Sequence, residues 1–301
     1  MSKKPKVGMW SGLTAVTAVL TAGAIVGTTV AFHYTTTVNN YLDADTYKII
    51  KGDSDEDTEY FKSDFTSDEE RESYEAELCA QVEAEGAALL KNDNNALPLA
   101  SGAKVSLFGH GSVDLMYGGT GSGSVDTSKA PNFKQALEDQ GIQVNSTLWD
   151  LYSSDDMMKN YSRITPAAIS DTLEANTQYA VNEAPWSKLS SAESSFADYG
   201  DAAIVVFSRS GGEGADLPSG ENGTNDSWIK GQEGDGNYLA LSAEEKELLQ
   251  NLKTLKDNGT FKKIIVLVNS SNAIEMDFLN PEICGEDYGI DSAMWIGDVG
   301  Q

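Results

Sequence analysis

The sequence predicts an α/β fold in which helices sandwich a mostly parallel sheet, preceded by one transmembrane helix. Two observations concern the region 104–296, where short runs of apolar residues alternate with segments of helical periodicity. Runs that are apolar throughout are typical of strands buried on both faces, as parallel strands are. Strands separated by helices favour a layered α/β domain. The third observation is a long uncharged run near the N-terminus.

That uncharged run is long enough to cross a membrane. Lys3, Lys4 and Lys6 precede it, and residues 9–32 contain no charged side chain. About 20 apolar residues in a helix span the roughly 30 Å of hydrocarbon in a bilayer. Because the lysines precede the run and acidic residues dominate after it, the positive-inside rule places the N-terminus in the cytoplasm. Residues 1–34 are therefore interpreted as a cytoplasmic tip and a single-pass anchor in the cell membrane, with the main domain extracellular.

A cleaved signal peptide is the alternative interpretation of the N-terminus. Its small-residue cleavage site would be Ala22-Gly-Ala24. The apolar run continues well past this site, which favours an uncleaved anchor. Residues 35–74 are polar and acidic, and we interpret them as a stalk that links the anchor to a folded domain at 75–301.

Local signals place the elements of that domain in order. Ser242 and Glu245 have the spacing of a capping box at the start of one helix, and Gly141 stands where another helix should end. The predicted strands are 104–108, 142–144, 201–207, 263–268 and 292–296. The predicted helices are 69–91, 132–140, 165–180 and 243–256.

Polar and glycine-rich loops follow the predicted strands. The first contains Gly118-Gly-Thr-Gly-Ser-Gly123, the second runs from Ser208 to about Tyr238, and the third is Asn269-Ser-Ser-Asn272. Ligands of parallel α/β sheets gather at the carboxyl ends of the strands, where these loops begin. Glu213 stands between glycines in the second loop, and so long a loop in a compact domain is typical of function or of disorder. The third loop could bind a ligand or cap the next helix.

The amino-acid composition limits which binding partners and which kinds of site are expected. The net charge is −26, from 47 acidic and 21 basic residues, which excludes a surface suited to nucleic acid. A neutral sugar meets no such repulsion, although the charge also serves solubility. Two histidines and two cysteines predict neither a metal site nor a disulfide framework. A nucleotide-dependent enzyme is a further alternative, but Asp114 stands where the dinucleotide fingerprint requires its third glycine. No cofactor is expected.

Several motifs together resemble the α/β-sandwich domain of family 3 glycoside hydrolases, the β-glucosidase-like enzymes. They cover roughly residues 75–301 in a consistent order. They are Glu85-Gly-Ala-Ala-Leu-Leu-Lys-Asn92 through Leu97-Pro-Leu99, Val105-Ser-Leu-Phe-Gly109, Gly118-Gly-Thr-Gly-Ser-Gly123, Val205-Val-Phe-Ser-Arg-Ser-Gly-Gly-Glu-Gly-Ala-Asp216, Tyr238-Leu-Ala-Leu-Ser-Ala-Glu-Glu245 and Trp295-Ile-Gly297. The resemblance implies an (α/β)6-type sandwich, here incomplete.

The resemblance also implies a retaining mechanism with two carboxyl groups, one a nucleophile and the other an acid/base. By motif the acid/base maps first to Glu213, second to Glu233 and third to Glu221. An acid of this kind needs a raised pKa. Asp216 could position the loop or contact the sugar. The residues Gly119, Thr120 and Ser122 of the first loop are further candidates for substrate contact.

The chain departs from the family at the nucleophile. The family's aspartate lies in a (β/α)8 barrel, typically within a Ser-Asp-Trp motif, and neither occurs in the sequence. The chain is therefore predicted to be the N-terminal part of a longer enzyme, ending early at Gln301 and inactive alone. Its partners would be that barrel and a β-glucoside or oligosaccharide. The alternative is a non-catalytic surface module that binds carbohydrate or protein.

Overall fold

The computed structural model describes residues 7–42, 61–123, 125–164, 179–213, 217 and 237–300. The chain divides into two compact units, Met1–Asp64 and Phe65–Gln301. The boundaries of stalk and domain predicted from the sequence stay a prediction.

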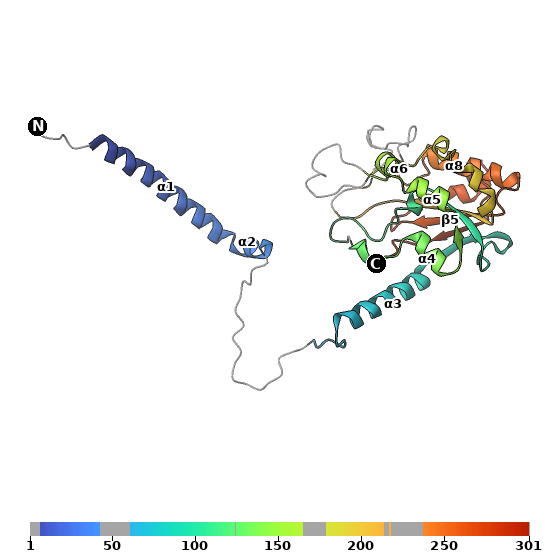
Figure 1. Ribbon diagram of the computed structural model, residues 1–301, viewed down its shortest axis with the longest axis horizontal. Coiled ribbons are helices and arrows are strands. Elements are labelled where there is room, and N and C mark those ends of the chain that lie inside the picture. The colour runs from blue at the N-terminus through green and yellow to red at the C-terminus, as the bar shows by residue number, and fades with distance from the viewer. Residues whose placement is uncertain are drawn as a thin grey trace, which may run out of the picture. The chain divides into compact units, whose positions relative to one another are not determined.

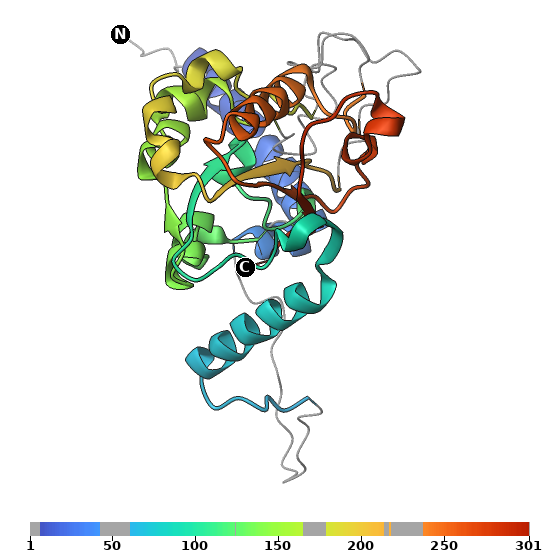
Figure 2. The same ribbon diagram turned by 90° about the vertical axis from the view of Figure 1, so that its right-hand side faces the viewer.

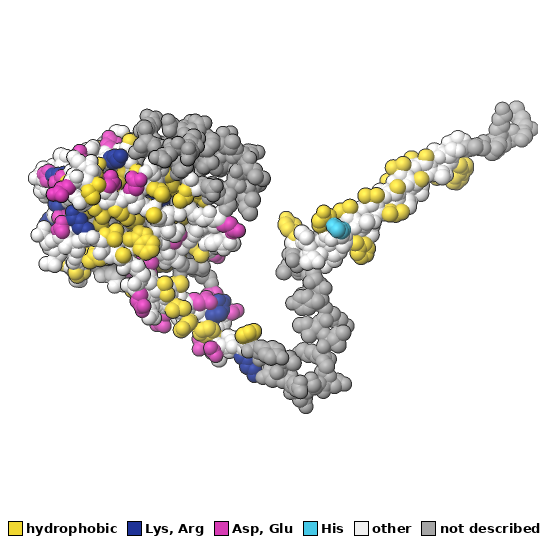
Figure 3. All heavy atoms as spheres, turned by 180° about the vertical axis from the view of Figure 1, so that it is seen from behind, with side chains coloured by type: hydrophobic (Ala, Val, Ile, Leu, Met, Phe, Trp, Pro, Cys, Tyr) yellow, Lys and Arg dark blue, Asp and Glu magenta, His cyan; other side chains and the backbone are white. Residues whose placement is uncertain are grey.

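The first unit contains the helices α1 (Val7–His33) and α2 (Thr35–Tyr41). At about 1.5 Å per residue, α1 is about 40 Å long. Its stretch Trp10–His33 is long and apolar enough to cross a membrane by length and composition. Hydrophobic side chains line it in Figure 3. Threonine hydroxyls along α1 donate to carbonyls four residues earlier, which satisfies them without water; they belong to Thr14, Thr17, Thr21, Thr28 and Thr29.

The second unit is built on one six-stranded sheet with the order β1-β6-β5-β4-β2-β3. The strands are β1 (Ala88–Asn92), β2 (Lys104–Phe108), β3 (Gln143–Val144), β4 (Ala202–Ser208), β5 (Ile264–Asn269) and β6 (Ser292–Trp295). Strands β2 to β6 run parallel to one another, and β1 alone is antiparallel, where it pairs with β6. The predicted α/β class with a mostly parallel sheet is confirmed.

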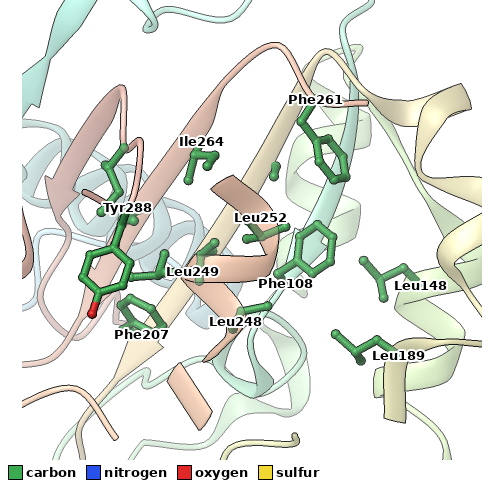
Figure 4. Packing of buried hydrophobic residues seen from close by; sticks show 14 of the residues in the cluster. Phe108, Leu148, Leu189, Phe207, Leu248, Leu249, Leu252, Phe261, Ile264 and Tyr288 are labelled. Atoms are coloured by element: carbon green, nitrogen blue, oxygen red, sulfur yellow. The ribbon is translucent and has the colours of Figure 1, made fainter. Parts of the chain in front are cut away.

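One face of the sheet carries the larger core. Side chains of β4 and β5 alternate between the two faces, and Val205, Phe207, Ile264 and Val266 point into this core. The helices α5 (Ser146–Tyr152), α6 (Asp155–Asn160) and α8 (Ala243–Asp257) cover this face (Figures 1 and 2). Figure 4 shows Phe108, Phe207, Phe261 and three leucines of α8 packed together. Each such fully buried side chain contributes about 1.5–3 kcal/mol.

The other face of the sheet is covered less completely. Val105, Leu107 and Ile204 pack there against α4 (Phe133–Asp139) and the segment 97–99. Leu89 of the edge strand β1 is 52% exposed. The apolar alternation along β2 and β4 thus fills both layers of the sandwich, as a buried parallel sheet requires.

Helix α3 (Asp68–Gly86) ends earlier than the sequence suggests. The predicted helix 69–91 was wrong beyond Gly86, because 88–92 form β1 and pair with β6. Ser67 caps the helix start by accepting from the N–H of Glu70 at 3.2 Å. The side chains of α3 are not buried, and Figures 1 and 2 show the helix extending away from the sheet.

The remaining elements lie mainly in the connections. The predicted helix 243–256 is confirmed with its capping box, since Glu245 and Ser242 bind each other's backbone N–H. The predicted helix 165–180 falls largely outside the described residues. The chain also forms α9 (Pro281–Cys284), and the short 3-10 helices are η1 (Asp93–Asn95), η2 (His110–Ser112), η3 (Gly121–Gly123), η4 (Thr127–Lys129), η5 (Trp186–Leu189), η6 (Glu193–Ser195), η7 (Ala197–Tyr199) and η9 (Asp277–Leu279).

Candidate functional site

The carboxyl ends of β2, β4 and β5 meet at one edge of the sheet, because these strands are parallel and adjacent. The three loops that the sequence singles out begin at this edge. Asn269 links the loop after β2 to the segment after β6, because its Nδ2 donates to the carbonyls of Met116 at 3.0 Å and Gly297 at 2.7 Å. Asn269 therefore has a structural role, because its side-chain amide hydrogen-bonds backbone carbonyl groups of other segments.

Glu213 lies in the loop after β4 and is exposed to solvent. Its Oε2 accepts two hydrogen bonds from Ser122, one from the backbone N–H at 3.0 Å and one from Oγ at 2.5 Å. The Ser122 hydroxyl and then its N–H hold the pKa of Glu213 below the ordinary value. This direction is opposite to the raised pKa expected of an acid. The reason is that two donors favour the ionised form while nothing buries the group.

The glycine-rich loop after β2 runs directly against the Glu213 loop. The backbone N–H of Thr120 donates to the carbonyl of Gly211 at 3.3 Å, and Thr120 also forms a parallel bridge with Gly212. Gly121 has φ +69°, and a Cβ there would lie 2.7 Å from the Cβ of Glu213. Only glycine permits this approach.

The structure brings together part of the predicted site. Thr120, Ser122 and Glu213 are in contact, and Gly119 lies beside Gly211. The predicted residues Asp216, Glu221 and Glu233 lie outside the described residues.

A buried ion pair closes the base of the long loop, and sequence reasoning missed it. Arg209 and Glu245 are 0% and 1% exposed, and both guanidinium nitrogens Nη1 and Nη2 bind the carboxylate, at 2.8 and 2.7 Å. Arg209 Nε donates to the carbonyl of Tyr238 at 2.7 Å, and the Tyr238 hydroxyl donates to the carbonyl of Ser210 at 3.0 Å. The two ends of the loop that carries the candidate glutamates are thus held together.

A second charge cluster, partly buried, involves the loop after β2. Asp114 receives Nη2 of Arg163 at 3.0 Å and lies 3.2 Å from Nε2 of His110. Burial by itself would raise the pKa of Asp114, but the His110 hydrogen bond and the Arg163 charge lower it below the ordinary value. Arg163 Nη1 also donates to Ser208 Oγ at 3.3 Å, which ties this loop to the end of β4.

Glu183 is a buried carboxyl beside that cluster, 5% exposed. Its Oε2 accepts from the N–H of His110 at 2.7 Å, and its Oε1 accepts from the N–H of Ala184 at 2.9 Å. Burial raises the pKa of Glu183 to about 7, although the two N–H groups and the charge of His110 oppose the rise. No sequence pattern marked this residue, because its burial depends on the tertiary fold.

We expect Glu183 to make the free energy of unfolding fall as the pH rises from about 4.5 to about 7. The unfolded chain loses this proton near the ordinary pKa of 4.5, whereas the folded chain keeps it until about 7. The contribution is therefore complete below the unfolded pKa and is lost through the folded one. It amounts to something on the order of 3 kcal/mol. Urea unfolding is measured at about pH 5 and about pH 8. Between these two pH values the free energy of unfolding should fall less in Glu183→Gln than in the wild type.

Glu193→Gln is the matched control for this measurement, because Glu193 is exposed on η6. It should keep the wild-type dependence of unfolding free energy on pH. Identical pH dependence in the wild type and in Glu183→Gln would contradict the prediction.

These contacts show what the edge of the sheet can do chemically. One exposed carboxylate, Glu213, is held by a loop that is itself tied to the sheet, so a ligand could reach it without a large rearrangement. Among the described residues, no group of three or more His, Cys, Asp or Glu side chains is arranged to hold a metal ion.

Comparison with known proteins identifies the domain built around this edge. Residues 87–295 match the family described as "Glycosyl hydrolase family 3 C-terminal domain". The chain belongs to glycosyl hydrolase family 3. The resemblance drawn from the sequence motifs is thereby confirmed.

Curated relatives and solved structures of family 3 agree with this assignment. β-Glucosidase A of Butyrivibrio fibrisolvens is 31% identical over 216 residues, which is 66% of this chain and 23% of that protein. A β-glucosidase of Ruminococcus albus is 29% identical over 227 residues, 74% of this chain and 20% of that protein. The chain thus spans between a fifth and a quarter of the length of these relatives.

Two solved β-glucosidases share the fold of the family 3 domain. The enzyme from Paenibacillus barengoltzii has a TM-score of 0.54 at 25% identity, over 74% of this chain and 21% of its own. β-Glucosidase 3B from Thermotoga neapolitana, solved with glucose, has a TM-score of 0.54 at 23% identity, over 77% of this chain and 28% of its own.

Proposed function

We propose that this family 3 domain supplies the acid/base carboxyl of a retaining glycosidase that acts on β-glucoside-like substrates. The position of Glu213 carries the proposal: it follows the buried strand β4, lies at the carboxyl edge of the sheet and is held by the glycine-rich loop after β2. The relatives named as β-glucosidases support the substrate class.

The proposed chemistry divides between two carboxyl groups. A nucleophilic carboxylate attacks the anomeric carbon, while Glu213 gives its proton to the departing glycosidic oxygen and later removes a proton from water. The nucleophile would come from a separate barrel domain, since no Ser-Asp-Trp motif occurs among the 301 residues.

This role requires that Glu213 be protonated when substrate is bound. In the described domain the carboxyl is exposed, and Ser122 lowers its pKa. Enclosure by the sugar and by the barrel would remove water from the carboxyl, which disfavours its charged form and raises the pKa. The proposal therefore places the pKa shift in the closed enzyme rather than in this domain alone.

The experiment compares Glu213→Gln, Glu233→Gln and Glu221→Gln in the full product of the reading frame. Each variant is assayed on an aryl β-glucoside with and without azide. The acid/base variant should lose turnover and regain it with azide, because the small anion replaces water at the glycosyl-enzyme without needing a base. Unchanged turnover in all three variants would overturn the proposal and favour a non-catalytic module that binds carbohydrate or protein.

We also propose that α1 anchors the enzyme in the cell membrane with the N-terminus in the cytoplasm. Cys79 and Cys284, the two cysteines of the chain, are both free and partly exposed, and both lie in the second unit, Phe65–Gln301. A membrane-impermeant maleimide added to intact cells should therefore label the wild type and should not label a variant with Cys79→Ser and Cys284→Ser. Labelling only after lysis would contradict this orientation, and loss of an N-terminal tag from the mature protein would indicate cleavage.

A further inference from the structure

We propose that Ser122 is a positioning residue that determines which oxygen of Glu213 carries the proton exchanged with the substrate. The inference rests on the proposed acid/base role of Glu213. Ser122 belongs to the loop after β2 and Glu213 to the loop after β4, 91 residues further along the chain. Their contact is therefore a product of the tertiary fold.

Both hydrogen bonds from Ser122 reach the same carboxylate oxygen. Oε2 of Glu213 accepts from the N–H at 3.0 Å and from Oγ at 2.5 Å. Within the described part of the chain, no hydrogen bond to Oε1 is found. A backbone N–H can only donate, and the carbonyl oxygen of a neutral carboxyl group accepts better than its hydroxyl oxygen, so the two donors favour Oε2 as the carbonyl oxygen. The proton of the neutral acid therefore belongs on Oε1, which is left for the substrate.

The loop that presents Ser122 is fixed by further contacts. Thr120 Oγ1 donates to the Glu213 carbonyl at 3.1 Å and lies 3.1 Å from the hydroxyl oxygen of Tyr179. Tyr179 is completely buried, and its ring packs at a tilt against that of Tyr238, with the ring centroids 5.8 Å apart. The glycine-rich loop is thus tied to the core on one side and to the Glu213 backbone on the other. Such support is what a positioned catalytic group requires.

The contact also affects the charge state of Glu213. Hydrogen bonds to an ionised carboxylate are short and stronger than those between neutral groups. Ser122 therefore stabilises the carboxylate that remains after the proton has been given to the leaving oxygen. In the later step, Oε1 is free to take a proton from water while Ser122 holds Oε2.

The test uses Ser122→Ala, Ser122→Thr and the control Ser101→Ala. Ser101 is an exposed serine in the turn before β2, at the opposite end of that strand from the site. NMR titration of the Glu213 carboxyl in the chain measures its pKa. The dependence of kcat/KM on pH is measured on the full product of the reading frame. Urea unfolding of each variant checks that it is folded.

Ser122→Ala should raise the pKa of Glu213, because one of the two donors that favour its charged form is lost. The basic limb of the kcat/KM profile should move to higher pH, and kcat on a substrate with a poor leaving group should fall about tenfold, as the carboxyl loses orientation. Ser122→Thr keeps the hydroxyl and should therefore keep the wild-type pKa of Glu213, pH profile and kcat. Ser101→Ala should match the wild type in all three. A purely structural role for Ser122 would leave the titration of Glu213 unchanged.

The outcomes separate this inference from the function on which it rests. If Glu213→Gln is inactive but Ser122→Ala changes neither the titration of Glu213 nor the pH profile, the inference about Ser122 is overturned and the proposed function stands. If Glu213→Gln keeps full turnover, the proposed function is overturned and this inference with it.

Discussion

Glu213→Gln in the full-length enzyme is expected to lower kcat by about 10²- to 10⁴-fold on glucosides with poor leaving groups, the range that a positioned general acid supplies. The loss should depend on the leaving group. A glucoside whose aglycone departs as a stable anion needs little protonation, so glycosylation of the enzyme should be nearly normal and the second step should become limiting. The comparison of two such substrates measures this dependence directly.

Azide gives an independent check on the same variant. It should raise the rate on the activated glucoside by attacking the glycosyl-enzyme, and the product should be a β-glucosyl azide, since two inversions retain the configuration. Glu233→Gln and Glu221→Gln are matched controls because they remove the same charge from the same loop. Azide rescue in one of these variants instead of in Glu213→Gln would move the acid/base assignment to that residue.

Arg209→Met is expected to lower the free energy of unfolding by about 3–5 kcal/mol, the cost of breaking a buried ion pair from one side. The variant leaves the Glu245 carboxylate buried without its counter-ion. It also removes the donors to the carbonyls of Tyr238 and Ala240, both at 2.7 Å. Because these bonds hold the ends of the Glu213 loop together, turnover should fall as well as stability.

Urea unfolding of the whole chain in detergent, followed by tryptophan fluorescence, measures this loss. The control is Lys262→Met, which breaks the exposed pair Lys262–Asp201, whose side chains are 72% and 36% exposed. An exposed pair contributes only about 0–1 kcal/mol, so the control should change little. Arg209→Met with Glu245→Leu should be less destabilised than Arg209→Met alone, since no unpaired charge remains. Equal midpoints for Arg209→Met and Lys262→Met would contradict the prediction.

Much of the fold could be predicted because its signals are local. The strands predicted at 104–108, 201–207 and 263–268, of which the last two are mainly apolar runs, are the buried central strands of the sheet, with ends shifted by at most one residue. The capping box of Ser242 and Glu245 is likewise a local signal, because both residues lie within a stretch of four. The family could be recognised for a related reason, since its motifs are short segments in a fixed order.

Other features depended on partners distant in the sequence. Leu89 and Leu90 read as part of a helix, yet they lie in β1 because β6, some 200 residues later, offers an open edge. For Glu245, the capping role was visible in the sequence, whereas its ion pair with Arg209 was not.

The sequence by itself determined the α/β class, the order of the central strands and helices, the family and the position of Glu213 directly after a buried strand. Only the tertiary structure decided that Ser122 binds one oxygen of Glu213, that Arg209 closes the base of its loop and that Glu183 is buried with a pKa near 7. The physical reason is that apolar periodicity and capping act within a few residues. Hydrogen bonding and desolvation of a charged group depend instead on whatever the fold places beside it.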